Sequence, residues 1–206
     1  MPSIDPVHLL PKQQTAIVAQ GPGQLAIQHD APVPGLAPDM AIVKTAAVAI
    51  NPADAKMLDY SPSPGAIHGY DFAGVVVAIG EDALASGKLS VGDRVAGLVH
   101  GMNKLRPDVG AFAEYVGAYA DLLLKIPGKM SFEEAASLGT GIATASLSLF
   151  SEMRVPASLG QLRGDKSNDQ TEAQRKEREL VLVAGGSTAT GTRALQLLKL
   201  YVIAIL

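Results

Sequence analysis

The chain has 206 residues, with 17 basic and 20 acidic side chains, a formal net charge of −3 and no cysteine. The near-neutral charge argues against nucleic-acid binding, and the lack of cysteine excludes disulfides, a thiolate nucleophile and a cysteine-built zinc site. The first ten residues lack a basic stretch followed by an apolar one, and the most apolar long charge-free segment, 135–151, is too rich in Gly, Ser and Thr for a membrane span. We therefore expect a soluble protein of the cytoplasm without a signal peptide.

From Thr15 to Ile126 the sequence predicts short strands rich in Val, Ile and Ala, separated by turn signals such as Pro22-Gly23. Several short strands at this spacing favour an irregular β-barrel over a βαβ sheet. The expected strands are Thr15–Ala19, Leu25–Gln28, Met40–Ile50, Val75–Ile79, Arg94–Val99, Ala113–Ala118 and Leu122–Ile126.

The pattern changes to helical after Pro127. Ser131 with Glu134 three residues later forms a capping box, which stabilises a helix start by about 1 kcal/mol. We expect two helices, Phe132–Leu138 and Thr140–Phe150, and a domain boundary near Pro127.

Residues 163–179 carry ten charged side chains among seventeen, and their only hydrophobic side chain is Ala173. This composition favours a charged, solvated linker. A helix that docks to a partner is the alternative, and the missing apolar face argues against it.

A strand–loop–helix–strand order follows, with strands at Leu180–Ala184 and Tyr201–Leu206, a loop at 185–191 and a helix at Thr192–Leu200. This order opens a doubly wound sheet, and one βαβ unit cannot cover both faces of a sheet. We therefore expect an α/β chain with a β-rich part and an incomplete nucleotide-binding domain. The predicted domains are a barrel at 1–127, interdomain helices at 128–162, the linker at 163–179 and the βαβ unit at 180–206.

The loop at 185–191 differs from two phosphate-binding patterns. Thr192 and Arg193 stand where a P-loop requires Lys and Ser/Thr, so a nucleoside triphosphatase is excluded. The loop also departs from G-x-G-x-x-G, and as Gly185-x-x-Thr188-x-x-Gly191 it resembles the looser version of quinone-reductase-like dehydrogenases. Amides at a helix N-terminus after such a loop would face an anion, although an ordinary turn is the alternative.

The Asn51-Pro52-x-Asp54 stretch is typical of a turn that caps the next helix, because both polar side chains can bond local amides. Lys56 adds a cation that could meet a phosphate. In the stretch 69–74, Tyr70 stands where zinc alcohol dehydrogenases carry a His ligand. Because the four histidines share no ligand spacing, we expect no metal site and exclude the zinc-dependent mechanism; they are His8, His29, His68 and His100.

The ordered landmarks INPAD (50–54), GYDFAG (69–74), VGDRV (91–95), GAFAEY (110–115) and VLVAGGSTATG (181–191) resemble the medium-chain dehydrogenase/reductase superfamily. Within it, the chain looks most like the zinc-free, trans-acting enoyl reductases of fungal polyketide pathways. The resemblance implies a GroES-like barrel packed on a Rossmann domain, with NADPH and substrate between them. It also implies conjugate reduction, in which hydride reaches the β-carbon of an α,β-unsaturated acyl thioester and a proton reaches the α-carbon.

The same resemblance implies a partner, namely a polyketide synthase or a synthase–peptide synthetase hybrid whose own reductase domain is inactive. Carried over by position, it implies an NADPH site with two sides and a substrate-lining helix. These sets are Ala53, Asp54, Ala55 and Lys56 on the barrel side, Ser187, Thr188, Ala189 and Thr190 on the Rossmann side, and Thr144, Ala145, Ser146 and Leu147 on the helix.

No catalytic acid is assigned. Tyr60 lies near the position where some related reductases carry a proton-donating tyrosine, but its offset favours a packing or surface role. Two other functions stay open: an NADPH-dependent quinone or enone reductase, and a non-catalytic remnant that keeps only the barrel.

Overall fold

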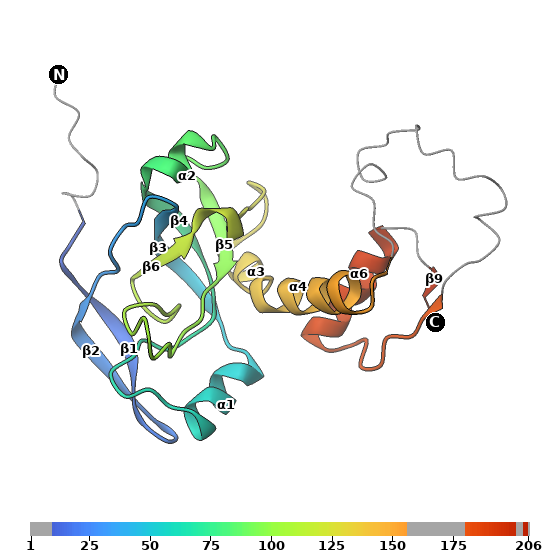
Figure 1. The fold of residues 1–206 in the computed structure, drawn as a ribbon, viewed down its shortest axis with the longest axis horizontal. Coiled ribbons are helices and arrows are strands. Elements are labelled where there is room, and N and C mark those ends of the chain that lie inside the picture. The colour runs from blue at the N-terminus through green and yellow to red at the C-terminus, as the bar shows by residue number, and fades with distance from the viewer. Residues whose placement is uncertain (1–9, 156–179, 201–203, 206) are drawn as a thin grey trace. The chain divides into compact units, whose positions relative to one another are not determined.

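The computed structural model describes residues 10–155, 180–200 and 204–205 (Figure 1). The chain divides into two compact units, Met1–Thr140 and Gly141–Leu206, and each is described by itself. The predicted linker at 163–179 and most of the predicted strand Tyr201–Leu206 lie outside the described residues. The domain boundaries expected from the sequence stay predictions.

A five-stranded antiparallel sheet forms most of the first unit. Strands β3 and β4 pair over almost their whole lengths, and β6 and β5 flank them. The sheet order is β6-β3-β4-β5-β7, with bounds β3 Met40–Ala49, β4 Asp71–Ile79, β5 Arg94–Leu98, β6 Tyr115–Tyr119 and β7 Leu124–Lys125.

A separate hairpin, β1 Gln13–Gly21 and β2 Gln24–Pro32, turns at Pro22-Gly23. Gly23 has a φ of +66°, a left-handed conformation that glycine adopts without the steric penalty of a Cβ atom. Two isolated bridges, Ala16 with Ala113 and Val18 with Ile67, join β1 to the rest of the unit. This arrangement of strands confirms the barrel-like architecture that their spacing predicts.

The core of the first unit lies between these strands. Its largest fully buried side chain is Phe72 on β4, and small or β-branched residues pack around it. Burying a large side chain such as Phe72 or Val76 stabilises the fold by about 1.5–3 kcal/mol. The sequence predicted β4 from Val75 onward, but the strand begins at Asp71, because Asp71 to Gly74 pair with both β3 and β5.

Short helices complete the first unit. The sequence predicted α3, which covers Phe132–Ala136, and its capping box is present: Ser131 Oγ accepts from the Glu134 N–H, and Glu134 Oε2 accepts from the Ser131 N–H. A 3₁₀ turn, η2, takes up the first residue of the predicted strand at Leu122–Ile126 and shortens it to β7. The remaining bounds are α1 Pro52–Tyr60, α2 Glu81–Ala85 and η2 Ala120–Leu122, and α2 was not expected.

The second unit contains the predicted strand–loop–helix–strand order. Strands β8 (Leu180–Val181) and β9 (Ala204–Ile205) pair in parallel, and α6 (Ala189–Leu200) joins them. Strand β8 is shorter than the predicted Leu180–Ala184 because the chain already turns at Ala184. Helix α6 begins three residues before the predicted Thr192, because Thr188 caps it.

The segment predicted as one helix at Thr140–Phe150 is divided. Helix α4 covers Gly139–Ser146 and continues as a π-helical stretch, η3, at Leu147–Glu152. In the second unit Ala145 and Leu149 pack with Ala194 and Leu198 of α6. None of the helices in the described part of the chain is both long enough and apolar enough to cross a bilayer.

Candidate functional site

The start of α1 is built from the Asn51-Pro52-Ala53-Asp54 stretch. Pro52 occupies the first helical position, where its missing N–H is not needed. The carboxylate of Asp54 accepts a hydrogen bond from the Asn51 main-chain N–H, with an O···N distance of 2.6 Å. The side chain of Asn51 also reaches Asp71, where Nδ2 donates to Oδ2 at 2.9 Å. The expectation of a local amide bond is confirmed for Asp54, and the pairing of Asn51 with Asp71 adds a contact far along the chain.

Asp71 joins two segments that are distant in the sequence. While Oδ2 accepts from Asn51, Oδ1 accepts from the main-chain N–H of Thr140 at 2.8 Å and from the Thr140 hydroxyl at 2.6 Å. The residue is 1% exposed. A Cβ atom on Gly139 would lie 2.6 Å from Asp71 Oδ1 and 2.8 Å from the Gly97 carbonyl oxygen, so the close approach of α4 requires glycine there. We call Asn51, Asp71 and Thr140 the Asp71 cluster.

A second buried pair lies beside this cluster. Asp54 and His68 are each 2% exposed, and within the described residues Asp54 Oδ1 and His68 Nδ1 have no hydrogen-bond partner. Burial raises the pKa of Asp54, although the Asn51 N–H and the nearby His68 oppose this. Burial lowers the pKa of His68, and the Asp54 charge opposes it. Burial also raises the pKa of Asp71, against its hydrogen bonds from Thr140 and Asn51.

The four residues expected on the barrel side of an NADPH site all lie in the first two turns of α1. Ala55 and Lys56 are exposed, Ala53 is half-buried, and the buried carboxylate of Asp54 is engaged with the Asn51 amide. Lys56 is therefore the member of this set with an exposed charge. The assignment of the set to a cofactor stays a prediction.

The loop before α6 is a tight turn built on two glycines and a threonine. Gly185 has a φ of +74°, and a Cβ atom on Gly191 would collide with the Gly185 carbonyl oxygen. The Thr188 hydroxyl donates to that carbonyl at 2.8 Å and accepts from the Gly191 N–H at 3.0 Å. It therefore caps the helix, and this hydroxyl is already used within the loop.

Two amides of this loop stay available to a ligand. Among the described residues, the N–H groups of Ala189 and Thr190 have no acceptor, and they lie in the first turn of a twelve-residue helix. Unpaired amides and the helix dipole favour an anion at this position. The residues present therefore fit the diphosphate of a dinucleotide. The assignment of Ser187, Thr188, Ala189 and Thr190 stays a prediction.

The residues expected to line the acyl substrate follow one another along α4 and the start of η3. Thr144 and Leu147 are exposed and Ser146 is half-buried, whereas Ala145 is 1% exposed and packs in the core of the second unit. Tyr60 is 85% exposed at the last residue of α1, which agrees with a surface role. Tyr70 stacks obliquely with His100 at 5.9 Å between ring centroids. No group of three His, Asp or Glu side chains within the described ranges is placed to hold a metal ion.

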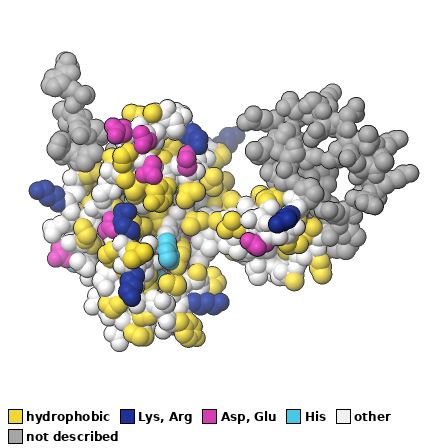
Figure 2. All heavy atoms as spheres, in the orientation of Figure 1, with side chains coloured by type: hydrophobic (Ala, Val, Ile, Leu, Met, Phe, Trp, Pro, Cys, Tyr) yellow, Lys and Arg dark blue, Asp and Glu magenta, His cyan; other side chains and the backbone are white. Residues whose placement is uncertain are grey.

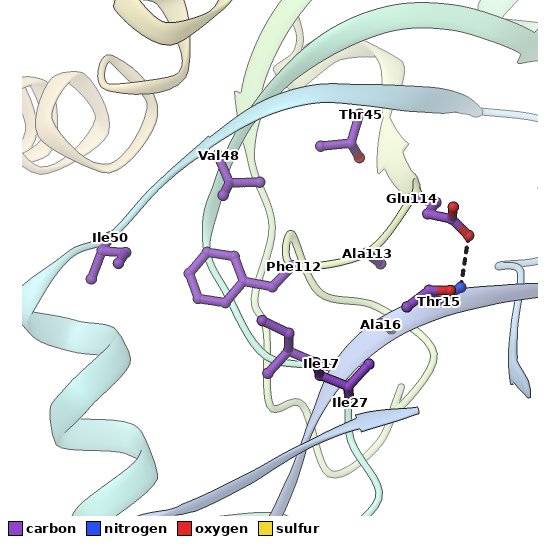
Figure 3. A pocket seen from close by; sticks show the side chains of 10 residues that line it. All are labelled: Thr15, Ala16, Ile17, Ile27, Thr45, Val48, Ile50, Phe112, Ala113 and Glu114. Atoms are coloured by element: carbon purple, nitrogen blue, oxygen red, sulfur yellow. Dashed lines mark hydrogen bonds between the residues drawn. The ribbon is translucent and has the colours of Figure 1, made fainter. Parts of the chain in front are cut away.

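An apolar recess of about 570 Å³ on the first unit was not expected from the sequence (Figure 3). Strands β1, β2 and β3 and the segment before β6 contribute to it, so its residues are scattered along the chain. Figure 2 shows hydrophobic side chains interspersed with charges of both signs over the visible face of this unit. The recess is lined by Thr15, Ala16, Ile17, Ile27, Thr45, Val48, Ile50, Phe112, Ala113 and Glu114.

Comparisons with known proteins agree with this architecture. The family model of the alcohol dehydrogenase GroES-like domain matches residues 37–128. The trans-enoyl reductase caaB of Aspergillus niger is 66% identical over 97% of this chain and 52% of its own length. The trans-enoyl reductase thnE of Trichoderma harzianum is 60% identical over 97% and 52%. The chain thus spans about half the length of the curated relatives it matches.

Solved structures share the fold. The quinone oxidoreductase of Coxiella burnetii has a TM-score of 0.62 and 26% identity, covering 93% of this chain and 55% of its own. Mycobacterial Rv1454c complexed with NADPH has a TM-score of 0.64 and 26% identity, covering 94% and 52%. With these likenesses and the landmark motifs, the chain shares the fold of medium-chain dehydrogenases and reductases and is similar in sequence to fungal trans-enoyl reductases.

Proposed function

We propose that this chain functions as a trans-acting enoyl reductase, which reduces the α,β-unsaturated acyl thioester of a growing polyketide with NADPH in fungal secondary metabolism. The observation that carries the proposal is the 66% identity to the Aspergillus niger trans-enoyl reductase over 97% of this chain. The partner would be a polyketide synthase, or a synthase–peptide synthetase hybrid, that lacks a working reductase domain of its own.

The cofactor would be held from two sets of residues. In the second unit the amides of Ala189 and Thr190 would bind the diphosphate, and Ser187 and Thr188 would shape the loop around it. In the first unit Lys56 would supply a cation, with Ala53, Asp54 and Ala55 forming the surface beside it. We propose NADPH and not NADH as the cofactor, because the mycobacterial structure with this fold was solved with NADPH.

The chain's own residues would contribute orientation and the exclusion of water. When bound, NADPH supplies the hydride that is added to the β-carbon, and a proton reaches the α-carbon. Thr144, Ala145, Ser146 and Leu147 would line the path of the acyl chain, and of these Thr144 and Leu147 have exposed side chains. Small side chains on this helix leave room for a long acyl group.

A quinone or enone reductase is the second candidate function. The likeness to the Coxiella burnetii quinone oxidoreductase, at a TM-score of 0.62, favours it. Both candidates use the same hydride chemistry and differ in the electron acceptor. They are therefore separated by the substrate and not by the cofactor.

Two measurements test the proposal. In the first, NADPH is added to the isotope-labelled chain and followed by NMR, and we expect the largest shift changes at the Ala189 and Thr190 amides. In the second, the protein is mixed with NADPH and either a carrier-bound enoyl thioester or a free quinone. Mass spectrometry should show the acyl chain gaining two hydrogens. Turnover of the quinone alone would support the second candidate and contradict the first.

A further inference from the structure

We infer that Asp71 is a positioning residue, one buried carboxylate that holds both the N-cap residue of α1 and the first turn of α4. What it positions rests on the proposed function, because these two segments carry residues expected at the cofactor and at the acyl substrate. The contacts themselves stand without that assignment.

Three donors converge on this carboxylate. Asn51 Nδ2 donates to one oxygen, and the main-chain N–H and hydroxyl of Thr140 donate to the other. Asn51 precedes Asp71 by 20 residues and Thr140 follows it by 69, so no local turn explains the arrangement. An ionised carboxylate only accepts hydrogen bonds, and it is the side chain that satisfies three donors at once.

The charged form of Asp71 is stabilised by these bonds against its burial. Burying a carboxylate without partners is very unfavourable, and the three donors offset part of that cost. The other titratable groups around it are Asp54 on α1, and His68 and Tyr70 on the segment that leads into β4. The Asp54 carboxylate accepts from the main-chain N–H of Asn51, whereas the Asp71 carboxylate accepts from the Asn51 side chain. Both carboxylates therefore contact the same residue.

The consequences reach the predicted site residues through helix geometry. Fixing Asn51 fixes where α1 begins, and hence the direction in which Lys56 projects. Thr140 is the last residue of the first unit, and its main-chain N–H and its hydroxyl both donate to Asp71. Holding Thr140 therefore fixes the start of α4 within that unit. One side chain thus holds both the start of α1 and the start of α4.

The test compares Asp71→Asn with the exchanged pair Asn51→Asp/Asp71→Asn in the complete chain. In the single variant the new amide cannot accept from both Asn51 and Thr140, because one of its two ends is a donor. In the double variant the donor and the acceptor between positions 51 and 71 are interchanged, and the bonds to Thr140 are kept. Asp30→Asn is the matched control, since Asp30 is exposed on β2.

The readout is local. Hydrogen exchange of the Thr140 amide, and the Asn51 side-chain NMR signals, report the two ends of the cluster, while the Val76 amide in the core of β4 reports global stability. For Asp71→Asn we expect the side-chain NMR signal of Asn51 to shift or disappear. Where the NH₂ end of the new side chain faces Thr140, hydrogen exchange of the Thr140 amide should be accelerated by about tenfold or more relative to that of Val76. The double variant should restore the Thr140 exchange rate.

If Asp71 had a purely structural role, its substitution would accelerate hydrogen exchange of the Val76 and Thr140 amides equally, and the double variant would not restore the Thr140 rate. Either result would overturn the inference. If Asp71→Asn does not fold, Thr140→Val and Thr140→Ser provide the same comparison. Only the serine variant keeps the hydroxyl donor, so only the valine variant should loosen the start of α4. These readouts need no NADPH, so a failure of cofactor binding would contradict the proposed function and leave this inference standing.

Discussion

The guanidinium of Arg94 lies 4.4 Å from the centre of the Phe132 ring and also bonds three main-chain carbonyls. Nη1 donates to Pro127 and Gly128 at 3.2 and 3.1 Å, and Nη2 donates to Met130 at 2.7 Å. Arg94 on β5 therefore anchors the segment that leads from β7 into α3. A planar, five-donor group suits this combination of stacking and several carbonyls.

Replacing Arg94 by lysine should lower the free energy of unfolding by about 1–2 kcal/mol, because an ammonium cannot stack on Phe132 and bond three carbonyls together. Urea unfolding of the wild type and the variant gives this difference. Arg106→Lys is the control, since the exposed ion pair of Arg106 with Asp108 contributes little. Equal losses for the two variants would contradict the anchoring role of Arg94.

Much of the first unit could be predicted from the sequence because its signals are local. Alternating Val, Ile and Ala residues and Gly-rich turns marked all seven strands, and Ser131 with Glu134 marked α3. The predicted start of α6 was three residues too late, because a threonine within a Gly-rich stretch predicts a loop. In the structure Thr188 instead caps the helix. Helix α2 was missed because five residues carry too short a periodicity.

The contacts of the candidate site were harder to predict from the sequence. The INPAD and GYDFAG motifs were noticed, but nothing in either indicates that Asn51 bonds Asp71 or that Asp71 bonds Thr140. Such contacts depend on strand register and on the path of the chain between them. The apolar recess was missed for the same reason, since its residues come from three strands and from the segment before β6.

Replacing Thr188 by alanine should destabilise α6 by about 1 kcal/mol, because the Gly191 N–H loses its acceptor and the Gly185 carbonyl loses a donor. Thr188→Ser keeps the hydroxyl and should behave like the wild type. Hydrogen exchange of the Gly191 amide measures the effect. An alanine variant with unchanged exchange would show that the hydroxyl does not cap the helix.

Replacing Gly191 by alanine should distort the loop, because the new Cβ would collide with the Gly185 carbonyl oxygen. Such overpacking costs about 1–3 kcal/mol. The NADPH-induced shifts at Ala189 and Thr190 should weaken together with the stability of α6. Gly128→Ala is the control, since nothing lies within 4 Å of a Cβ atom there. If the loop tolerates alanine with its NADPH response intact, the close approach does not shape the binding site.

The pH dependence of stability should contain two opposed contributions from the buried groups. The pKa of Asp54 and that of Asp71 are raised above 3.8, so the folded chain takes up these protons before the unfolded chain does. Their contribution to stability therefore falls as the pH rises from 3.8 through the folded pKa values. The pKa of His68 is lowered below 6.5, so the folded chain keeps this ring neutral while the unfolded chain charges. Its contribution falls as the pH drops from 6.5 through the folded pKa.

The variant His68→Asn isolates the histidine contribution. The stability of the wild type minus that of the variant should be constant above pH 6.5 and should decline as the pH drops below it. Urea unfolding at a series of pH values provides the curve, and His29→Asn, on the exposed face of β2, is the matched control. A difference that is flat across this window would mean that His68 titrates alike in the folded and unfolded chains. Its burial beside Asp54 would then be compensated by the carboxylate, because the attraction between an imidazolium and Asp54 would balance the loss of hydration.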